Sequence, residues 1–327
     1  MFYNEDCISG CPKYFENNSV DLIITDPPYG ISGDKLHKHY NRDEKYVIKG
    51  YVDISEGDYP IFSEKWIFEA ERILKPGGAI YIIAGYSCLR HILNALSKTK
   101  LKEVNHIIWK YNFGVFTTQK YISSHYHILY YVKKGKKPTF NTYAFYSDSE
   151  KNDSGGSKNY LDREDVWIIN REYKPGMIKN KNELPKTLLT KMILYSSNLD
   201  DLVCDFFLGS FSTAKVAIGL GRNACGFEIN KNAFDIQINE INNIKKGELL
   251  TYFRKVPQNM IVNKGKPLSI NEKEEIISEY IKLKKEGKTK KSSIQQLSQI
   301  YGRGVFSIGK LIKTAAEDVF NENNLFK

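Results

Sequence analysis

The sequence predicts an α/β protein: a doubly wound, mostly parallel β-sheet covered by helices, followed by a small all-α domain at the C-terminus. Two observations predict it. Short apolar runs of strand length alternate with segments whose apolar residues recur at helical spacing. After about residue 255 the strand signals stop and lysine becomes frequent. Because 327 residues suit one large and one small domain, we expect domains at 1–255 and 256–327.

Six apolar runs of strand length justify the sheet. The clearest, Val20 to Thr25, stops at Asp26-Pro27-Pro28, which no strand continues through. Another begins at Ala79, after a turn predicted at Lys75-Pro76-Gly77-Gly78. In chain order the predicted strands cover residues 20–25, 79–84, 106–109, 127–132, 202–206 and 224–228.

Helices are predicted between these strands, where apolar residues recur every three or four positions. They cover residues 62–74, 89–98, 186–196 and 213–220. Two polar stretches, Ile31–Pro60 and Lys136–Lys181, fit no regular element and are too long to be idle connections.

Charge and cysteine content narrow the class of protein. Lys and Arg exceed Asp and Glu by 48 to 38, and this net charge of +10 favours a polyanionic partner, nucleic acid before any other. The sequence has neither a run long enough for a membrane span nor a signal peptide at its start. Its five cysteines have no paired spacing, which argues against disulfides and a zinc site. We therefore expect a cytoplasmic protein with no membrane partner and no metal.

The tetrapeptide Asp26-Pro27-Pro28-Tyr29 carries the strongest chemical signal. It directly follows a buried strand, at the sheet edge where open α/β folds bind ligands. Asp26 and the Pro27 carbonyl can both accept hydrogen bonds from one exocyclic amine, which aims the nitrogen lone pair at an electrophile. Tyr29 offers a ring on which an unstacked base can lie. The alternative is a proline-rich turn with an incidental carboxylate.

A second motif, Asp205-Phe206-Phe207-Leu208-Gly209-Ser210, also lies between a buried strand and a helix. A glycine in such a turn lets a ligand approach the backbone closely. Glu228 follows Gly209 by 19 residues, at the end of the next predicted strand. An acidic residue at about this spacing binds ribose hydroxyls in nucleotide-binding folds.

These motifs together resemble those of S-adenosylmethionine-dependent DNA amino-methyltransferases. Asp26-Pro27-Pro28-Tyr29 looks like the family's catalytic motif, and Asp205–Ser210 with Gly226-Phe227-Glu228 is similar to its cofactor motifs. The catalytic motif precedes the cofactor motif, which is the order of the β group, whose members methylate adenine N6 or cytosine N4. Aspartate before Pro-Pro-Tyr favours adenine. The resemblance covers about residues 1–250 and implies a Rossmann-like methyltransferase fold.

The resemblance also implies roles for individual residues. The catalytic residues Asp26, Pro27, Pro28 and Tyr29 would hold a flipped target base. The cofactor-binding residues would be Asp6, Cys7, Asp205, Phe207, Gly209, Ser210 and Glu228, with Glu228 on the ribose and Asp6-Cys7 near the adenine. Two residues depart from the family pattern. Phe211 replaces a glycine and is expected to narrow the methionine end of the pocket, and Leu184 replaces the lysine before Pro185.

The C-terminal segment has a different signature. Residues 264–313 hold 12 basic and 5 acidic residues, a net charge of +7. A short helix over 294–302, a turn at Gly302 and a second amphipathic helix over 305–313 look like a helix-turn-helix. Ser307, Lys310 and Lys313 would then face DNA. The alternative is a basic three-helix cap that reads no sequence.

The sequence therefore predicts a site-specific DNA methyltransferase that transfers a methyl group from S-adenosylmethionine to adenine N6. Cytosine N4, RNA, and a DNA-binding regulator with a degenerate methyltransferase fold remain as alternatives. The variable region Lys136–Lys181 is expected to read the target sequence, while the C-terminal lysines contact phosphates and position the protein. The expected partner is DNA, and a cognate restriction endonuclease and a homodimer are left open.

Overall fold

The structure is a computed structural model that describes residues 1–28, 54–112, 114, 118–141, 163–171, 183–251 and 267–324. Its contacts divide the chain into two compact units. The described residues of the first unit lie within 1–251 and those of the second within 267–324.

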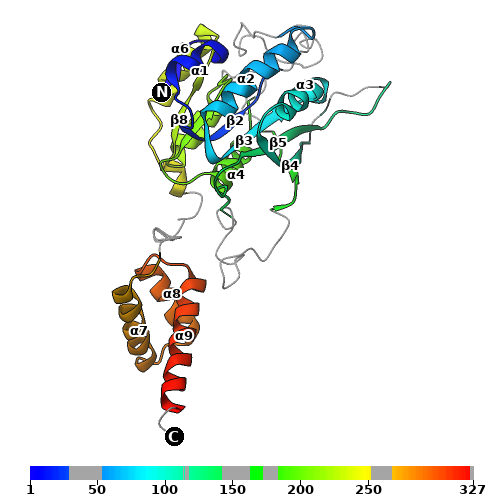
Figure 1. Ribbon diagram of the computed structural model, residues 1–327. Helices are drawn as coiled ribbons and strands as arrows, with labels where there is room; N and C mark the ends of the chain where they lie inside the picture. Colours follow the sequence, from blue (N-terminus) through cyan, green and yellow to red (C-terminus); the bar gives the residue numbers. More distant parts are fainter. Residues whose placement is uncertain are drawn as a thin grey trace. The chain divides into compact units, whose positions relative to one another are not determined.

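In the described part of the first unit, eight strands form one sheet in the order β1-β8-β7-β2-β3-β5-β4-β6. Figure 1 shows the sheet with helices packed against it. All neighbouring pairs are parallel except β3–β5 and β4–β5, which confirms the prediction of a mostly parallel sheet. The strands are β1 (Phe2–Tyr3), β2 (Val20–Thr25), β3 (Leu74–Ala84), β4 (Leu101–Lys110), β5 (His125–Lys133), β6 (Val166–Ile168), β7 (Leu202–Asp205) and β8 (Asn223–Phe227).

Helices cover both faces of this sheet, as a doubly wound fold requires. Ile23 of β2 packs in one apolar cluster with residues of α1, α2 and α3, whereas Leu22 and Ile24 pack in a second cluster with residues of α4, α5 and α6. Successive strand residues point to opposite faces, so one strand supplies both cores. The helices are α1 (Cys7–Tyr14), α2 (Tyr59–Ile73), α3 (Tyr86–Ser97), α4 (Lys186–Ser196), α5 (Ser212–Gly219) and α6 (Lys231–Ile241), and a short 3₁₀ helix, η5, spans Glu248–Thr251.

Two local predictions were wrong. The turn predicted at Lys75–Gly78 is an irregularity inside β3: Val20 pairs with Leu74 and Leu22 with Ala79, so β3 advances five positions while β2 advances two. The stretch predicted to be irregular over 136–181 contains β6, which pairs with β4. Most of the rest of that stretch, and residues 31–53 of the other polar stretch, lie outside the described residues.

The second unit contributes three helices among its described residues: α7 (Ile270–Lys285), α8 (Lys290–Ile300) and α9 (Val305–Asn324). Ser269 and Thr289 cap the first two of them with side-chain oxygens that accept backbone N–H groups. Leu283, Leu297 and Ile308 meet in an apolar core of their own. Within the described residues, no helix of either unit is long and apolar enough to span a lipid bilayer.

Candidate active site

The two motifs meet at the centre of the sheet, where β2 and β7 lie side by side. The strand that follows β2 in the chain, β3, lies on one side of this pair, and the strand that follows β7, β8, lies on the other. Such a switch in strand order opens a crevice at the carboxyl ends of the strands, where open α/β sheets bind ligands. The Asp26 turn and the turn after Asp205 both emerge there.

The Asp26-Pro27-Pro28 turn is anchored from α2. Pro27 is buried, and Asp26 and Pro28 are half-buried. The hydroxyl of Tyr59, the first residue of α2, donates a hydrogen bond of 2.7 Å to the Pro28 carbonyl. Because Tyr59 is itself 1% exposed, the donor is fixed by the core. Tyr29, predicted to stack on the target base, lies outside the described residues.

Asp205 joins the two turns. Its Oδ1 accepts hydrogen bonds from the Thr25 hydroxyl at the end of β2 and from the Phe207 N–H, each at 3.0 Å. Burial raises the pKa of this carboxyl to about 6, and hydrogen-bond donors on Thr213, Phe207 and Thr25 oppose that rise. At neutral pH the Asp205 carboxyl is therefore mostly ionised. It lies next to Thr25, the residue that precedes Asp26.

Glu228, at the end of β8, closes the glycine turn. One carboxylate oxygen accepts the Gly209 N–H at 2.7 Å and the other accepts the Asn230 N–H at 2.7 Å. Gly209 adopts a left-handed conformation with φ +51°, which glycine allows at little cost. Burial raises the pKa of Glu228 above its ordinary value. A carboxylate has about four lone-pair directions, so two remain for ribose hydroxyls.

The remaining residues of the second motif are mostly buried around this turn. Ser210 shares a hydrogen bond of 2.9 Å with Ser212 at the start of α5. Phe207 is half-buried, and its ring lies 5.8 Å from that of Phe62 and 5.6 Å from that of Trp66, both on α2. These rings tie the turn to the helix that carries Tyr59.

Phe211 and Leu184, the two residues that differ from the family pattern, both lie in the apolar core. Phe211 has φ +58°, the left-handed conformation that a glycine would adopt freely, and its ring is fully buried between Phe2 and Phe234, at 5.3 and 5.8 Å. A side chain in this conformation costs on the order of 1–3 kcal/mol, which the buried ring offsets. Leu184 is buried in the same apolar cluster, just before α4.

Asp6 and Cys7 stand at the start of α1, next to β1. The Asp6 carboxylate caps the helix by accepting the Ile8 N–H at 2.6 Å. Cys7 is buried, and burial raises the pKa of its thiol well above the ordinary value, so it remains protonated. All five cysteines are buried free thiols, as their scattered spacing indicates.

Comparison with known proteins identifies the family. A sequence profile of DNA methylases of the N6/N4 type matches residues 20–240, more than half of the chain, and this range contains both motifs. This chain belongs to the N6/N4 DNA methylase family.

Curated members of the methylase family are similar over most of this chain. The type II methyltransferase M.HpaI of Haemophilus parainfluenzae is 32% identical over 231 residues, which is 68% of this chain and 68% of the relative. The type II methyltransferase M.BamHI of Bacillus amyloliquefaciens is 33% identical over 242 residues, 69% of this chain and 54% of the relative.

Solved structures share the methylase fold at low sequence identity. TTHA0409 of Thermus thermophilus, solved with S-adenosyl-L-methionine, matches with a TM-score of 0.52 at 20% identity, covering 73% of this chain and 92% of the other. The cytosine-N4-specific PvuII DNA methyltransferase matches with a TM-score of 0.54 at 14% identity, covering 77% and 93%. At these identities both likenesses show the fold alone.

The sequence prediction did not place Tyr59 at this site, because the predicted helix began at Phe62. Pro60 carried the signal: proline favours the first turn of a helix, so α2 should have been placed from Tyr59. Thr25 was included in the predicted strand, but its hydrogen bond to Asp205 follows only from the pairing of β2 with β7.

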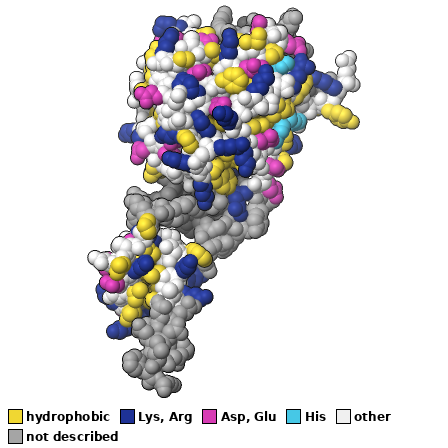
Figure 2. All heavy atoms as spheres, in the orientation of Figure 1, with side chains coloured by type: hydrophobic (Ala, Val, Ile, Leu, Met, Phe, Trp, Pro, Cys, Tyr) yellow, Lys and Arg dark blue, Asp and Glu magenta, His cyan; other side chains and the backbone are white. Residues whose placement is uncertain are grey.

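The predicted DNA-facing residues belong to the second unit. Ser307, Lys310 and Lys313 are exposed on α9, whose opposite face carries the buried Ile308 and Ile312. The space-filling view of Figure 2 shows basic and apolar side chains interspersed on the visible face of this unit.

Proposed function

We propose that this DNA methylase transfers the methyl group of S-adenosylmethionine to the N6 amine of an adenine that has left the duplex. The observation that carries the proposal is the hydrogen bond from Thr25 to Asp205, which holds the Asp26 turn beside the Gly209 turn at the switch point of the sheet. Aspartate before Pro-Pro-Tyr supports adenine over cytosine.

The residues of the second motif suit this cofactor. The two lone-pair directions left on Glu228 would accept ribose hydroxyls, and Asp205, Phe207, Gly209 and Ser210 would line the same turn. Asp6 and Cys7 would approach the adenine end from α1. When bound, S-adenosylmethionine supplies an electrophilic methyl group.

The first motif would prepare the target amine. The lone pair of an exocyclic amine is delocalised into the base, which makes the nitrogen a poor nucleophile. The Asp26 carboxylate and the Pro27 carbonyl would accept its two N–H groups and turn the lone pair outward. Pro28, held by Tyr59, fixes these acceptors, and Tyr29 would stack on the base and offset the cost of flipping it, a few kcal/mol.

We assign the methyl-transfer reaction to a domain at 1–255 and DNA binding to a helical domain at 256–327. The exposed Ser307, Lys310 and Lys313 on α9 support the second assignment, as does its pairing with α8 across a tight turn. The relatives are type II methyltransferases, which supports a role in restriction-modification. In that role the protein would act together with an endonuclease of the same specificity.

Mass spectrometry of nucleosides tests the reaction. Purified protein is incubated with labelled S-adenosylmethionine and duplex DNA, and the DNA is then digested. We expect N6-methyladenine with the unchanged chain and none with Asp26→Ala, which retains cofactor and DNA binding.

Each other outcome contradicts a stated part of the proposal. N4-methylcytosine would overturn the choice of base, and preferential labelling of RNA would overturn the choice of nucleic acid. DNA binding without any methylated product would indicate a regulator built on a methyltransferase fold. Full activity of Asp26→Ala would overturn the mechanism.

A further inference from the structure

A partly buried ion pair ties the connection between α8 and α9 to α7. Arg303, in this connection, donates from Nε and Nη2 to the two carboxylate oxygens of Glu272 on α7, at 2.7 and 2.6 Å. The Ser298 hydroxyl donates to the Arg303 carbonyl, and Gly302 takes the left-handed conformation that the turn requires, with φ +56°. The first turn of α9 is therefore presented at a fixed angle.

Phe306 projects from this first turn into solvent. Its side chain is 83% exposed, the highest value among the large apolar residues described in the second unit, where Ile270 follows at 73%. The buried Ile308 and Ile312 anchor the opposite face of α9 in the core, so Phe306 is not a displaced core residue. A phenylalanine ring kept in water forgoes the favourable free energy that its burial would contribute.

Two basic side chains share a stripe of α9 with this ring. Phe306, Lys310 and Lys313 follow one another at spacings of four and three residues, which places them on one stripe of α9. Lys310 and Lys313 are exposed there. Two further exposed lysines, Lys290 and Lys291, begin α8.

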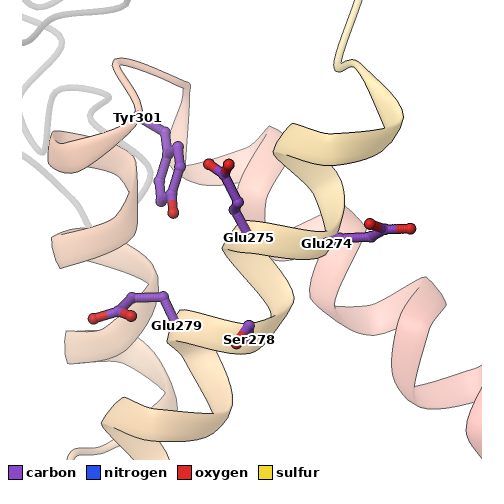
Figure 3. A pocket seen from close by; sticks show the side chains of 5 residues that line it. All are labelled: Glu274, Glu275, Ser278, Glu279 and Tyr301. Carbon is purple, nitrogen blue, oxygen red and sulfur yellow. The ribbon is translucent and has the colours of Figure 1, made fainter.

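Acidic side chains gather on α7. A hollow of about 410 Å³ is lined by Glu274, Glu275, Ser278 and Glu279 of α7 and by Tyr301. Figure 3 shows the Glu275 carboxylate directed toward the Tyr301 ring, with Glu274 pointing away. Because carboxylates repel phosphates, a duplex would approach the α9 stripe rather than this hollow.

We propose that Phe306 contacts the 5-methyl group of a thymine in the major groove, so that the second unit reads sequence as well as positioning the protein. This rests on the DNA-binding role proposed above for the unit. The thymine methyl is the apolar feature of the major groove, and phenylalanine is among the side chains that contact it. Lys310 and Lys313 would hold the helix in the groove through phosphates on either side. The inference goes beyond the positioning role expected from charge alone.

Uracil substitution provides the test, because it removes only this methyl group. The full chain first selects duplexes from a random pool, and each thymine of the selected duplex is then replaced singly by uracil. For the unchanged chain we expect one replacement to weaken binding about fourfold, the contribution of one buried methyl group. For Phe306→Ala the same replacement should have no effect.

Two further variants separate the possible failures. Ile270→Ala removes another exposed apolar side chain, at the start of α7, and should retain the full uracil effect. Lys310→Gln should weaken binding to every duplex and lower its salt dependence. If Lys310→Gln does so but Phe306→Ala keeps the uracil effect, or no replacement matters, base reading by Phe306 is wrong and DNA binding by the unit stands. If neither variant changes binding, the proposed DNA-binding role fails as well.

Discussion

The hydroxyl of Tyr59 connects the core of the first unit to the turn that carries Asp26. Replacing it with hydrogen in Tyr59→Phe leaves the ring in place and removes the 2.7 Å hydrogen bond to the Pro28 carbonyl. We expect kcat for methylation to fall about three- to tenfold, the value of one hydrogen bond, while the affinities for cofactor and DNA stay unchanged. Steady-state kinetics of Tyr59→Phe beside Tyr86→Phe, which removes an exposed hydroxyl on α3, measures this. Equal kcat values for the two variants would mean that Tyr59 has no positioning role.

A second prediction at the residue scale concerns Asp205 and the pH dependence of the free energy of unfolding. Burial raises the pKa of Asp205 to about 6, above the 3.8 of an ordinary aspartate, so the folded state binds this proton more tightly than the unfolded chain does. The free energy of unfolding therefore decreases as pH rises from about 4 to about 6, by at most about 3 kcal/mol from this group.

Asp205→Asn removes that titration and keeps an oxygen to accept from Thr25 and Phe207. We expect the variant to gain stability relative to the unchanged protein as pH rises through this window. Urea unfolding of both proteins at pH 4.5, 5.5, 6.5 and 7.5 tests it. A stability difference that stays constant with pH would show that Asp205 does not titrate as its burial implies.

At the scale of elements, Glu228 links β8 to the turn between β7 and α5. Glu228→Gln places an amide NH₂ against one of the two backbone N–H groups, at Gly209 or Asn230, that the carboxylate now accepts. We expect S-adenosylmethionine binding to weaken by about 1–3 kcal/mol. Calorimetric titration measures this, with Glu240→Gln on the exposed side of α6 as the control. Unchanged affinity in Glu228→Gln would place the ribose contact on another residue.

The elements themselves show what sequence patterns determine. β2 and α4 lie at the bounds predicted for them, because the Asp26-Pro27-Pro28 and Leu184-Pro185 sequences mark a strand end and a helix start. The direction of β5 was not predicted, since an apolar run looks the same in parallel and antiparallel strands. β6 was missed because three residues of strand in a polar region carry too little periodicity to detect.

Some features of the candidate site could likewise be predicted from the sequence, and others could not. Asp26, Asp205, Gly209 and Glu228 were predicted at the carboxyl edge of the sheet because each stands where a strand ends. The contact between Tyr59 and Pro28 depends on how α2 packs against the sheet, which no local pattern specifies.

At the scale of the whole molecule, the two units should contribute separately to DNA affinity. Truncation after Pro257 removes the lysine-rich helices and leaves the first unit with its own two apolar clusters. We expect the DNA dissociation constant to rise and the salt dependence of binding to flatten, by roughly 0.9 in slope for each lost phosphate contact. Fluorescence anisotropy between 50 and 200 mM salt, roughly the range where such contacts matter, measures both. An unaltered slope would mean that the first unit makes all the phosphate contacts.

The pairing of β2 with β7 also determines when the reactive edge can exist during synthesis. Thr25 and Asp205 are separated by 180 residues, so at ribosomal rates roughly 10–40 s pass between their emergence. Throughout that interval the edge of β2 that pairs with β7 has no partner for its backbone N–H and C=O groups. Assembly of the site is therefore a late, long-range event. If the chain is cut between these two strands, one piece carries the Asp26 motif and the other carries the Asp205 motif.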